Sequence, residues 1–516
     1  MVSFLRRFRD PQSFPGGMIA VWGAVFLYAL VLSFLMRNAF IDDAYIGYRY
    51  IDNLTHGQGF VFNPPDRIEG VTNIGWLLVL TPFSLFFDVT AVAKALSFFL
   101  LLGAVAATVK LARFIPAENG RSDAALFLPL AIVTNFDFSL FSSTGMETAL
   151  LAFGLAAMIW LAVLRSTWVG AAFLGAFVFL VHPESALVFP LALAFFSGFD
   201  AARWIKKLPS LAVFLALIAG ITIVRKLYFG DFLPNTFYAK PSAFGSLLEN
   251  ALLFLKGLNG NIPVPFYGWL ALPLWAYGLR RLWRSNRTVG SFAAAALCSG
   301  GIFALYAQRD WTALGRYFSP YIPIATLASV LGLAGIARLL PSLFSKAKRQ
   351  ELLVSLACIL LITVGVGRTL IFLFTDQSRE YPGFIITGVS LVEPSLWIRD
   401  HIPEKAVIAT GRLGAVSYFS GKRIFDYKYG LTERPVGRLR QKLHREFVDP
   451  RDPALGDLWT KAEPGYFLED TDRIIKSFQL NRKTMAQISI HGMDYRLLKT
   501  FKIGLFKEWA FYERVR

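Results

Sequence analysis

The stretch Ile19-Ala-Val-Trp-Gly-Ala-Val-Phe-Leu-Tyr-Ala-Leu-Val-Leu-Ser-Phe-Leu-Met36 carries no charged side chain and approaches the length of a membrane-spanning helix. Three arginines precede it, at Arg6, Arg7 and Arg9. A secretory signal peptide has a shorter apolar core, of about 7–15 residues, followed by a small-residue cleavage site. We therefore predict a retained first membrane helix whose basic end faces the cytoplasm.

The composition extends this prediction to most of the chain. Its 516 residues are 55% hydrophobic and 17% charged, whereas soluble proteins are about 25% charged. The 53 Lys+Arg against 35 Asp+Glu fit basic cytoplasmic loops and an anionic lipid leaflet better than a nucleic-acid partner. The two cysteines, Cys298 and Cys358, lie inside apolar runs, so they indicate neither a disulfide framework nor a metal cluster.

The order of apolar and basic segments predicts the crossings. Apolar stretches lie at 19–38, 74–87, 91–114, 124–141, 147–164, 167–181, 186–199, 208–228, 264–279, 290–307, 317–338 and 352–374. Basic residues between Arg203 and Lys207, Arg280 and Arg287, and Arg338 and Arg349 favour cytoplasmic loops. The N-terminus then faces the cytoplasm only if 74–87, which is short and contains Pro82, does not cross. We predict about eleven crossings with a re-entrant or surface-lying element at 74–87, and twelve remain an alternative.

These patterns predict an α-helical polytopic membrane protein with a small C-terminal α/β domain. Residues 1–375 form the membrane domain, which includes an outer loop at 39–90. The tail, 376–516, has more charged residues and contains strand-like runs such as Ala406–Thr410 and Gln487–His491. We expect this tail to lie outside the cytoplasm.

Polar residues gather in the predicted outer loops, where they are functional candidates. Within Ile41–His56, helical spacing places Asp42, Arg49, Asn53 and His56 on one stripe and Ala44, Tyr48 and Ile51 on the other. This predicts a short helix on the outer surface with its apolar stripe in lipid, or a solvated linker helix. Two adjacent carboxylates, Asp42 and Asp43, repel each other, so one of them needs a cationic or metal partner or a raised pKa.

Two further outer segments are candidates. His182-Pro-Glu184 interrupts an apolar sequence, so two half-length helices should meet there, either at a ligand group or at a hydrogen-bonded kink. Lys240 and Arg316 are suited to phosphate, while Tyr238 and Tyr317 could stack on a sugar or belong to the interfacial aromatic belt. The sequence contains no Walker glycine loop, no dinucleotide-binding glycine motif and no His-Glu-x-x-His, which argues against ATP-driven transport, nucleotide cofactors and zinc hydrolysis.

Several motifs occur together in a recognisable order. The chain reads Asp42-Asp-Ala-Tyr-Ile-Gly-Tyr-Arg49, Gly57-Gln-Gly-Phe-Val-Phe-Asn-Pro64 and Arg67-Ile-Glu-Gly-Val-Thr-Asn-Ile-Gly-Trp76, then Gly145-Met-Glu-Thr148, His182-Pro-Glu184, Pro234-Asn-Thr-Phe-Tyr-Ala-Lys240, Gly315-Arg-Tyr317 and Gly411 to Leu431. Over roughly 19–431 this resembles a GT-C membrane glycosyltransferase, and most closely the subgroup of the terminal β-arabinofuranosyltransferases. The break reads His-Pro-Glu where many relatives have Arg-Pro-Glu, and the tail carries no lectin-like pattern.

The resemblance implies roles for the candidate residues. An acidic residue at the head of the first outer loop acts as base, for which Asp42 is favoured, and Asp43 orients it or holds a divalent cation (Mg²⁺, Mn²⁺ or Ca²⁺). The expected donor-phosphate ligands are Arg49, His182, Lys240 and Arg316. The expected sugar or acceptor ligands are Glu69, Thr72, Asn73, Glu147, Glu184, Asn235 and Tyr238.

The function expected from the resemblance is inverting transfer of a sugar, with arabinofuranose favoured, from a polyprenyl-phosphate donor to a glycan, glycolipid or protein acceptor of the cell envelope. Transfer would occur on the extracytoplasmic face of the plasma (inner) membrane. A hexose such as mannose is the alternative sugar. Two other classes stay open, a lipid-sugar flippase and a non-catalytic envelope assembly factor. A flippase commonly shows repeated halves, which we do not see in the hydropathy.

Overall fold

A computed structural model of the chain describes residues 15–114, 124–165, 167–239, 267–306, 313–336, 346–374, 391–445, 447–503 and 507–515. The N-terminal arginines, the basic segment 338–345 and the start of the tail lie outside these ranges. The chain divides into two compact units. Unit 1 comprises Met1–Arg37, Ala93–Ala219 and Phe244–Arg379, and unit 2 comprises Asn38–Val92, Gly220–Ala243 and Glu380–Arg516. Unit 2 thus combines the tail with two predicted outer segments, while the domain boundary at 375 stays a prediction.

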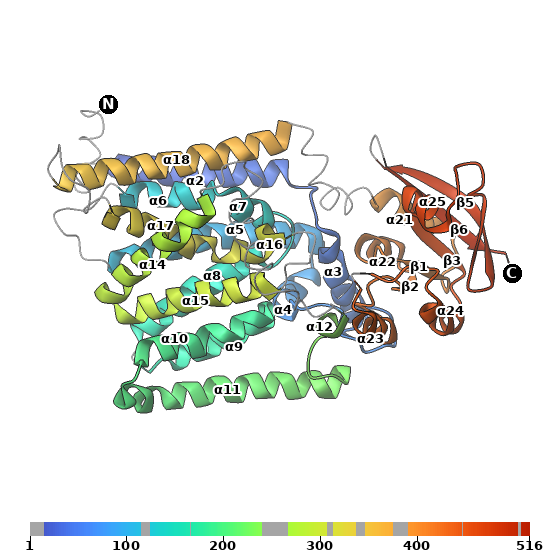
Figure 1. The fold of residues 1–516 in the computed structure, drawn as a ribbon, viewed down its shortest axis with the longest axis horizontal. Coiled ribbons are helices and arrows are strands. Elements are labelled where there is room, and N and C mark those ends of the chain that lie inside the picture. Colours follow the sequence, from blue (N-terminus) through green and yellow to red (C-terminus); the bar gives the residue numbers. More distant parts are fainter. Residues whose placement is uncertain are drawn as a thin grey trace. The chain divides into compact units, whose positions relative to one another are not determined.

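Unit 1 is helical, and its long helices α2, α11 and α18 run nearly parallel in Figure 1. Its helices are α2 (Pro15–Leu35), α5 (Val89–Leu111), η1 (Ala112–Phe114), α6 (Ala124–Val133), α7 (Phe136–Ser142), α8 (Thr148–Leu164), α9 (Val169–Val181), η2 (Pro183–Leu187), α10 (Val188–Ser197), α11 (Ala201–Phe229), α14 (Tyr267–Ser285), α15 (Arg287–Tyr306), α16 (Ala313–Phe318), η3 (Ser319–Tyr321), α17 (Ile322–Ile336) and α18 (Lys346–Phe374). The first residues of α5 and the last turns of α11 belong to unit 2.

The helices confirm a polytopic membrane protein. Within the described residues, five helices are long and apolar enough to cross a membrane: 17–35, 89–114, 201–229, 316–336 and 355–372. Every apolar stretch predicted from the sequence contains a helix. The stretch 124–141, however, is not one span but two short helices. Asn135 ends the first and caps the second, because its side chain accepts the N–H of Phe138 at 3.1 Å.

Small residues allow two helices of unit 1, α14 and α17, to pack closely. A Cβ on Gly332 would overlap the backbone carbonyl of Leu274, and one on Gly278 would overlap that of Ala328. The two backbones therefore touch, as is typical of helix pairs in membranes.

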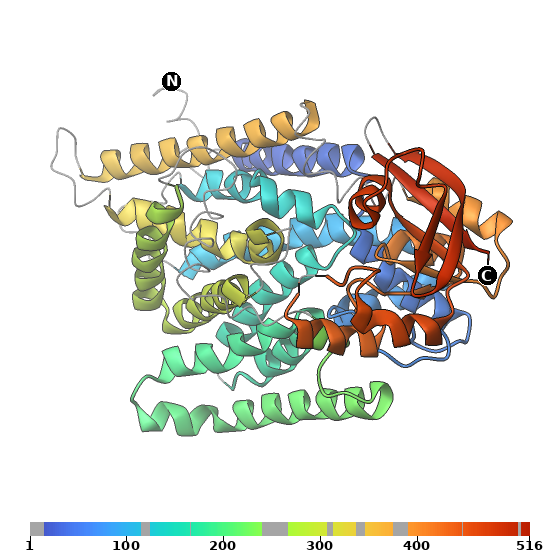
Figure 2. The same ribbon diagram turned by 45° about the vertical axis from the view of Figure 1, so that its right-hand side comes forward.

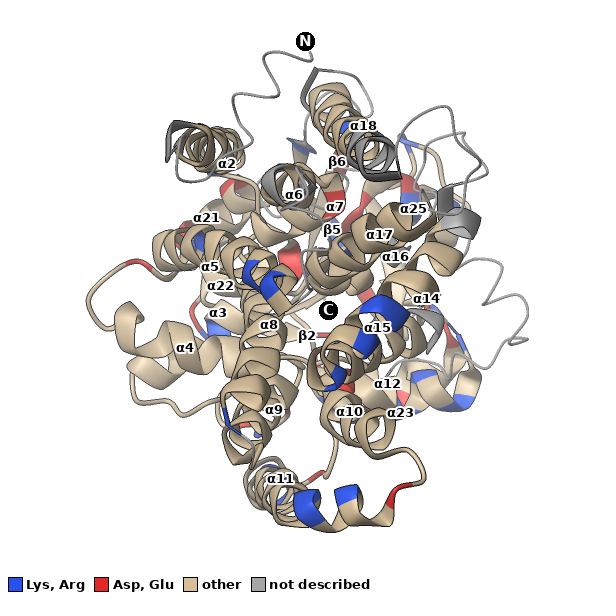
Figure 3. Cartoon of the chain, turned by 90° about the vertical axis from the view of Figure 1, so that its left-hand side faces the viewer, with Lys and Arg blue, Asp and Glu red and all other residues tan. Residues whose placement is uncertain are grey.

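Basic residues gather at one end of the unit 1 helices. In Figure 3, Lys and Arg colour the ends of α11 and α15 that face the viewer. Arg287, at the start of α15, donates to the carbonyl of Phe196 at 2.6 Å, which joins two predicted cytoplasmic turns. This arrangement agrees with both turns lying on one side of the membrane, and the orientation of the chain stays a prediction.

Unit 2 is built around a six-stranded mixed sheet. Before the tail it contains α3 (Asp42–Thr55), α4 (Ile74–Ser84) and α12 (Asn235–Ala239). The tail contains α21 (Val392–His401), β1 (Val407–Thr410), α22 (Gly414–Ser420), β2 (Arg423–Phe425), α23 (Arg434–Leu443), η4 (Pro453–Leu455), α24 (Gly456–Ala462), β3 (Tyr466–Asp470), α25 (Thr471–Phe478), β4 (Gln487–Ile490), β5 (Met493–Ile503) and β6 (Lys507–Arg514). The predicted α/β tail and both predicted strands are confirmed.

The sheet order is β2-β1-β3-β6-β5-β4. β1 is parallel to β2 and β3, with Ile408 opposite Ile424 and Ala409 opposite Phe467. The other neighbours are antiparallel, and β5 with β6 forms the long hairpin drawn in red in Figure 2. The edge strand β2 is closed by a side chain, because the Asn63 amide donates to the carbonyl of Ile424 at 2.8 Å and accepts its N–H at 3.1 Å. This pairing protects an edge that would otherwise be open.

Helix α4 fits the predicted element that does not cross. Its 11 residues include Pro82, and they span only about 17 Å, against about 30 Å for the hydrocarbon core. The residues that follow it are apolar and exposed: Leu85 by 60%, Phe86 by 79% and Phe87 by 67%. Such a tip is typical of a segment that inserts into one leaflet.

A buried ion pair stabilises the tail. Lys428 Nζ lies 2.8 Å from Glu469 Oε2, and their side chains are 4% and 3% exposed. Burial alone would raise the pKa of Glu469, but Lys428 and the Tyr427 hydroxyl outweigh burial and lower it to about 2. Because this pKa lies below the unfolded value of about 4.3, the pair stabilises the fold above that value. The contribution is lost as the pH falls toward about 2.

We expect Glu469→Gln to lower the melting temperature at neutral pH, because Lys428 is left buried without its partner at a cost of about 3–5 kcal/mol. The variant should also lose the acid-dependent part of the melting curve between about pH 4 and 2. Tryptophan fluorescence of the purified protein in detergent measures both effects. Asp457→Asn, at an exposed carboxylate of the same tail, is the control. An unchanged acid profile in Glu469→Gln would contradict the assignment.

Candidate functional site

The acidic pair of the motif lies at the start of α3 in unit 2. The Asp42 carboxylate accepts two backbone N–H groups at the start of α22, from Gly414 at 3.1 Å and from Ala415 at 2.9 Å. The first N–H groups of a helix have no partner inside the helix, so Asp42 caps α22 from a distant part of the chain. Burial raises the pKa of Asp42, while the Ala415 N–H and the Arg412 guanidinium lower it. Asp42 is 8% exposed and each of its oxygens accepts one backbone N–H, which fits a positioning residue better than the predicted base.

A second contact completes a clamp on α22. Arg49, two helical turns along α3 from Asp42, donates from Nη2 to the carbonyl of Gly421 at 3.0 Å, at the other end of α22. Gly414 allows the close approach, because a Cβ there would overlap the Asp42 carbonyl. Arg49 also lies 3.4 Å from Asp52 and is 9% exposed. Two of its guanidinium nitrogens thus contact the protein, Nε has no hydrogen-bond partner among the described residues, and the predicted phosphate role stays a prediction.

Aromatic rings fill the space between α3 and α22. The rings of Tyr45 and Tyr418 stack with centroids 5.7 Å apart, and Tyr48 meets Tyr418 at 6.1 Å. The predicted apolar stripe is buried, with Tyr48 at 0% and Ile51 at 1% exposure. The prediction that this stripe faces lipid is thus wrong, because the tail supplies its packing partner.

Asp43 differs from its neighbour. Consecutive helix residues are about 100° apart around the axis, so Asp43 does not share the face on which Asp42 meets α22. Asp43 is half-buried, whereas Asp42 is buried. A base must reach the proton of an incoming hydroxyl, and of the two carboxylates Asp43 has the access that this requires.

Glu69, a predicted sugar ligand, is half of a buried ion pair. Arg225 Nε of α11 donates to Glu69 Oε2 at 2.7 Å, and the two side chains are 4% and 1% exposed. Burial raises the pKa of Glu69 to about 7, against the lowering effect of Arg225. Glu69 Oε1 has no hydrogen-bond partner among the described residues. Sequence analysis did not single out Arg225, because this residue lies near the end of an apolar run.

Two other predicted sugar ligands precede α4. Thr72 is half-buried, and Asn73 is 6% exposed with its carbonyl accepting the N–H of Trp76 at 2.9 Å. Both lie in unit 2 with the acidic pair.

Asn235 and Tyr238 contact the tail. Asn235 Nδ2 donates to the carbonyls of Gly430 and Leu431 at 2.7 and 2.8 Å. Asp426 fixes that loop, because its carboxylate accepts the N–H groups of Tyr429 at 3.0 Å and Thr432 at 3.3 Å. The Arg438 guanidinium covers the Tyr238 ring at 3.5 Å. Both side chains thus link to the tail, while Asn235 Oδ1 has no hydrogen-bond partner among the described residues, and the predicted sugar-binding roles stay predictions.

Unit 1 contains a second polar cluster, at the predicted break. His182 hydrogen-bonds Glu184 through Nδ1, and its Nε2 lies 3.7 Å from Glu147 Oε1. Tyr321 donates to Glu184 Oε1 at 3.2 Å, and Ser299 donates to the Glu184 carbonyl at 2.8 Å. The predicted half-helices are confirmed as α9 and α10. The break is thus a hydrogen-bonded kink that also brings Glu147, from a distant part of the sequence, close to His182 and Glu184.

Two cations belong to the same unit. Arg316 is half-buried before α17, with its guanidinium 5.7 Å from the Tyr317 ring, and its charge acts on His182. Lys94 of α5 donates to the carbonyls of Met36 and Ser143 at 2.8 and 2.5 Å. The turn that carries Ser143 leads on to Glu147. Sequence reasoning missed Lys94, although a single charge inside an apolar span is a sufficient signal.

Two predictions stay untested by this geometry. Lys240 lies outside the described residues. Among the described residues no group of three or more His, Cys, Asp or Glu side chains is arranged to hold a metal ion. The acidic pair supplies two carboxylates, fewer than the six to eight oxygen ligands that Ca²⁺ takes. We therefore derive no step through a metal.

Comparison with known proteins supplies the fold. ArnT from Cupriavidus metallidurans, in a crystal structure bound to undecaprenyl phosphate, matches with a TM-score of 0.53 over 95% of this chain and 97% of that chain, at 15% identity. Its apo structure matches with a TM-score of 0.54 at 16% identity. This chain has a GT-C fold. The GT-C assignment confirms the predicted fold class, and the number of crossings stays a prediction.

Curated relatives agree with the GT-C fold. A terminal beta-(1->2)-arabinofuranosyltransferase of Mycobacterium tuberculosis is 28% identical over 283 residues, which cover 50% of this chain and 43% of the relative. One of Corynebacterium glutamicum is 27% identical over 279 residues, covering 49% and 40%. The match thus spans less than half the length of these relatives. Residues 385–513 match a family described as a domain of unknown function, DUF8728.

Proposed function

We propose that this chain is a membrane glycosyltransferase that moves a sugar, with arabinofuranose favoured, from a polyprenyl-phosphate donor to a glycan, glycolipid or protein acceptor of the cell envelope. The observation that carries the proposal is the acidic pair at the head of α3 within a GT-C fold. The named arabinofuranosyltransferases support the sugar. The undecaprenyl phosphate bound to ArnT supports the lipid donor.

In the proposed reaction, the Asp43 carboxylate takes the proton of the acceptor hydroxyl as that oxygen attacks the anomeric carbon of the donor. The bond from this carbon to the phosphate oxygen breaks, and the polyprenyl phosphate leaves with both electrons of that bond. One displacement of this kind inverts the anomeric centre. Asp42 acts through position, because its hydrogen bonds to α22 fix the first turn of α3.

Negative charge grows on the departing phosphate and needs cations that are already in place. In unit 1, Lys94 and Arg316 are the cations that we assign to this role. His182, held between Glu147 and Glu184, can add a proton donor. The Lys94 and Arg316 side chains are both half-buried, and less water screens a half-buried cation than a fully exposed one. We place the reaction on the extracytoplasmic face of the membrane, because the basic ends of α11 and α15 indicate which side is cytoplasmic.

The proposal is tested by incubating the purified protein in detergent micelles with polyprenyl-phosphate arabinofuranose and polyprenyl-phosphate mannose, followed by linkage analysis. We expect transfer from the pentose donor with inversion. Transfer from the mannose donor alone would show that the transferred sugar is mannose and not arabinofuranose. A protein that makes no product from any lipid-linked sugar, yet moves such lipids across vesicles, would be a flippase, and the enzyme proposal would be wrong.

Arg316→Ala should raise the donor KM by about tenfold or more and leave the acceptor KM nearly unchanged, because it removes a charge from the phosphate. Steady-state kinetics with each substrate varied in turn measure both constants. Arg165→Ala, at an exposed arginine after α8, is the control. A rise in the acceptor KM alone would contradict the assignment of Arg316 to the donor phosphate.

A further inference from the structure

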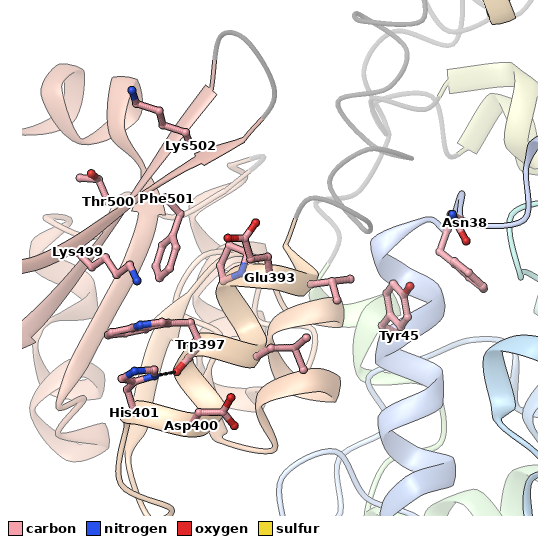
Figure 4. Close-up of a pocket in the computed structure, with 14 residues that line it drawn as sticks. Asn38, Tyr45, Glu393, Trp397, Asp400, His401, Lys499, Thr500, Phe501 and Lys502 are labelled. Carbon is pink, nitrogen blue, oxygen red and sulfur yellow. Dashed lines mark hydrogen bonds between the residues drawn. The ribbon is translucent and has the colours of Figure 1, made fainter.

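Unit 2 contains a cavity of about 800 Å³ between the start of α3 and the α21–β5 face of the tail (Figure 4). It is not part of the acidic pair or of the buried links described above. This volume lies within the 300–1,000 Å³ range of ligand pockets. A short oligosaccharide belongs to that size class.

Aromatic side chains from three elements form its walls. Phe40 comes from the segment just before α3, Tyr45 from the first turn of α3, Trp397 from α21 and Phe501 from β5. Trp397 is fixed in place, since its ring stacks on His401 at 4.4 Å with an interplanar angle of 12° and meets Phe501 at 5.6 Å. Figure 4 shows His401 and Lys499 on opposite sides of the Trp397 ring. A pre-arranged wall of this kind loses little entropy when a ligand binds.

The backbone of β5 is irregular where it reaches the cavity. A β-bulge between Leu497 and Lys499 shifts the register against β6. After the bulge, Lys499 and Phe501 both lie over Trp397, with Lys499 Nζ 4.3 Å from its ring centroid. Bulges often occur where a strand redirects side chains toward a site.

Charges of both signs line the cavity. Glu393 and Asp400 supply carboxylates, and Lys499 and Lys502 supply ammonium groups. A polyanion would be repelled by the carboxylates and a polycation by the ammonium groups. A neutral ligand with many hydroxyls suits all four side chains, because a hydroxyl donates to a carboxylate and accepts from an ammonium. Aromatic walls with a few polar groups complete the properties expected of a carbohydrate site.

We propose that this cavity binds the acceptor as a neutral glycan chain. The proposal deepens, and rests on, the transferase function proposed above. Tyr45 lines the cavity from the first turn of α3, the turn that also carries Asp43. A glycan held there lies next to the helix that carries the proposed base.

Direct binding tests the site without catalysis. The full-length protein in detergent is titrated with neutral arabinofuranosyl and mannosyl oligosaccharides, and with a uronic-acid oligosaccharide of equal length, by saturation-transfer NMR and calorimetry. We expect a neutral oligosaccharide to bind and Trp397→Ala to weaken its binding about tenfold. Because Trp397→Ala also removes packing, Asp400→Asn at an exposed carboxylate provides a second variant with an expected weakening of about threefold or more. Leu498→Ala, at the bulge but outside the cavity lining, is the matched control.

Steady-state kinetics distinguish a defect in acceptor binding at the cavity from a defect in the transfer reaction. In Trp397→Ala the acceptor KM should rise by the factor measured in binding, with the donor KM and kcat unchanged. Oligosaccharide binding without transfer from any lipid-linked sugar would support the cavity and contradict the transferase. The proposal is overturned by transfer whose acceptor KM is equal in the wild type and both variants, by absent binding of neutral oligosaccharides, or by tighter binding of the acidic one.

Discussion

Replacing Asp43 with asparagine is expected to lower kcat by about 10²–10⁴-fold, because it removes the proposed general base. The melting temperature should fall less than in an Asp42 variant, since Asp42 supplies the two hydrogen bonds to the start of α22. Turnover with a polyprenyl-phosphate sugar and a melting curve in detergent measure these quantities. Asp52→Asn, at a half-buried carboxylate on the same helix, is the matched control and should retain activity.

The Asp42→Asn variant distinguishes a positioning role of Asp42 from a role in the chemical step. Asp42→Asn should lower the melting temperature as well as the activity, because an amide cannot accept both N–H groups of α22, at a cost of about 1–3 kcal/mol. The sequence alone predicted the opposite assignment, with Asp42 as the base. An inactive but fully stable Asp42→Asn, beside an active Asp43→Asn, would restore that first assignment.

Arg225→Met is expected to destabilise the protein by about 3–5 kcal/mol, because it leaves the Glu69 carboxylate buried without its cation. A loss of this size lowers the melting temperature by about 6 °C or more. Since burial already raises the pKa of Glu69 to about 7, the variant should melt higher on acidification from about pH 8 to 6, as Glu69 becomes neutral.

A double-mutant cycle completes this test. Glu69→Gln together with Arg225→Met should recover a large part of the lost stability, because the unpaired charge is gone. Lys226→Met, at the exposed neighbour of Arg225, is the control. If Arg225→Met alone left the melting temperature unchanged, the ion pair would have no structural role, and Glu69 would again be a candidate sugar ligand.

The sequence predicted the architecture well, because hydropathy and charge act over whole segments. The membrane class, the two half-helices at His182-Pro-Glu184 and the α/β tail all follow from patterns longer than a helical turn. The split of 124–141 into α6 and α7 depends on one side-chain cap at Asn135, which a hydropathy window averages away.

The roles of individual polar residues were harder to predict, since they depend on partners far away in the sequence. Asp42, Arg49 and Asn235 look like ligands in an outer loop, yet α22 and the loop at 430–431 receive their hydrogen bonds. Arg225 and Lys94 were missed for the same reason, because their partners Glu69 and Ser143 lie far away in the sequence. A polar residue in a family motif can therefore serve the fold of the site without touching the substrate.

The account depends most on the side of the membrane where unit 2 lies. Gln58, which is exposed just after α3, can be changed to cysteine in a variant that lacks Cys298 and Cys358. A membrane-impermeant maleimide is then applied to intact cells, with permeabilised cells as the reference. The account predicts full labelling of position 58 in intact cells, and labelling only after permeabilisation would contradict it.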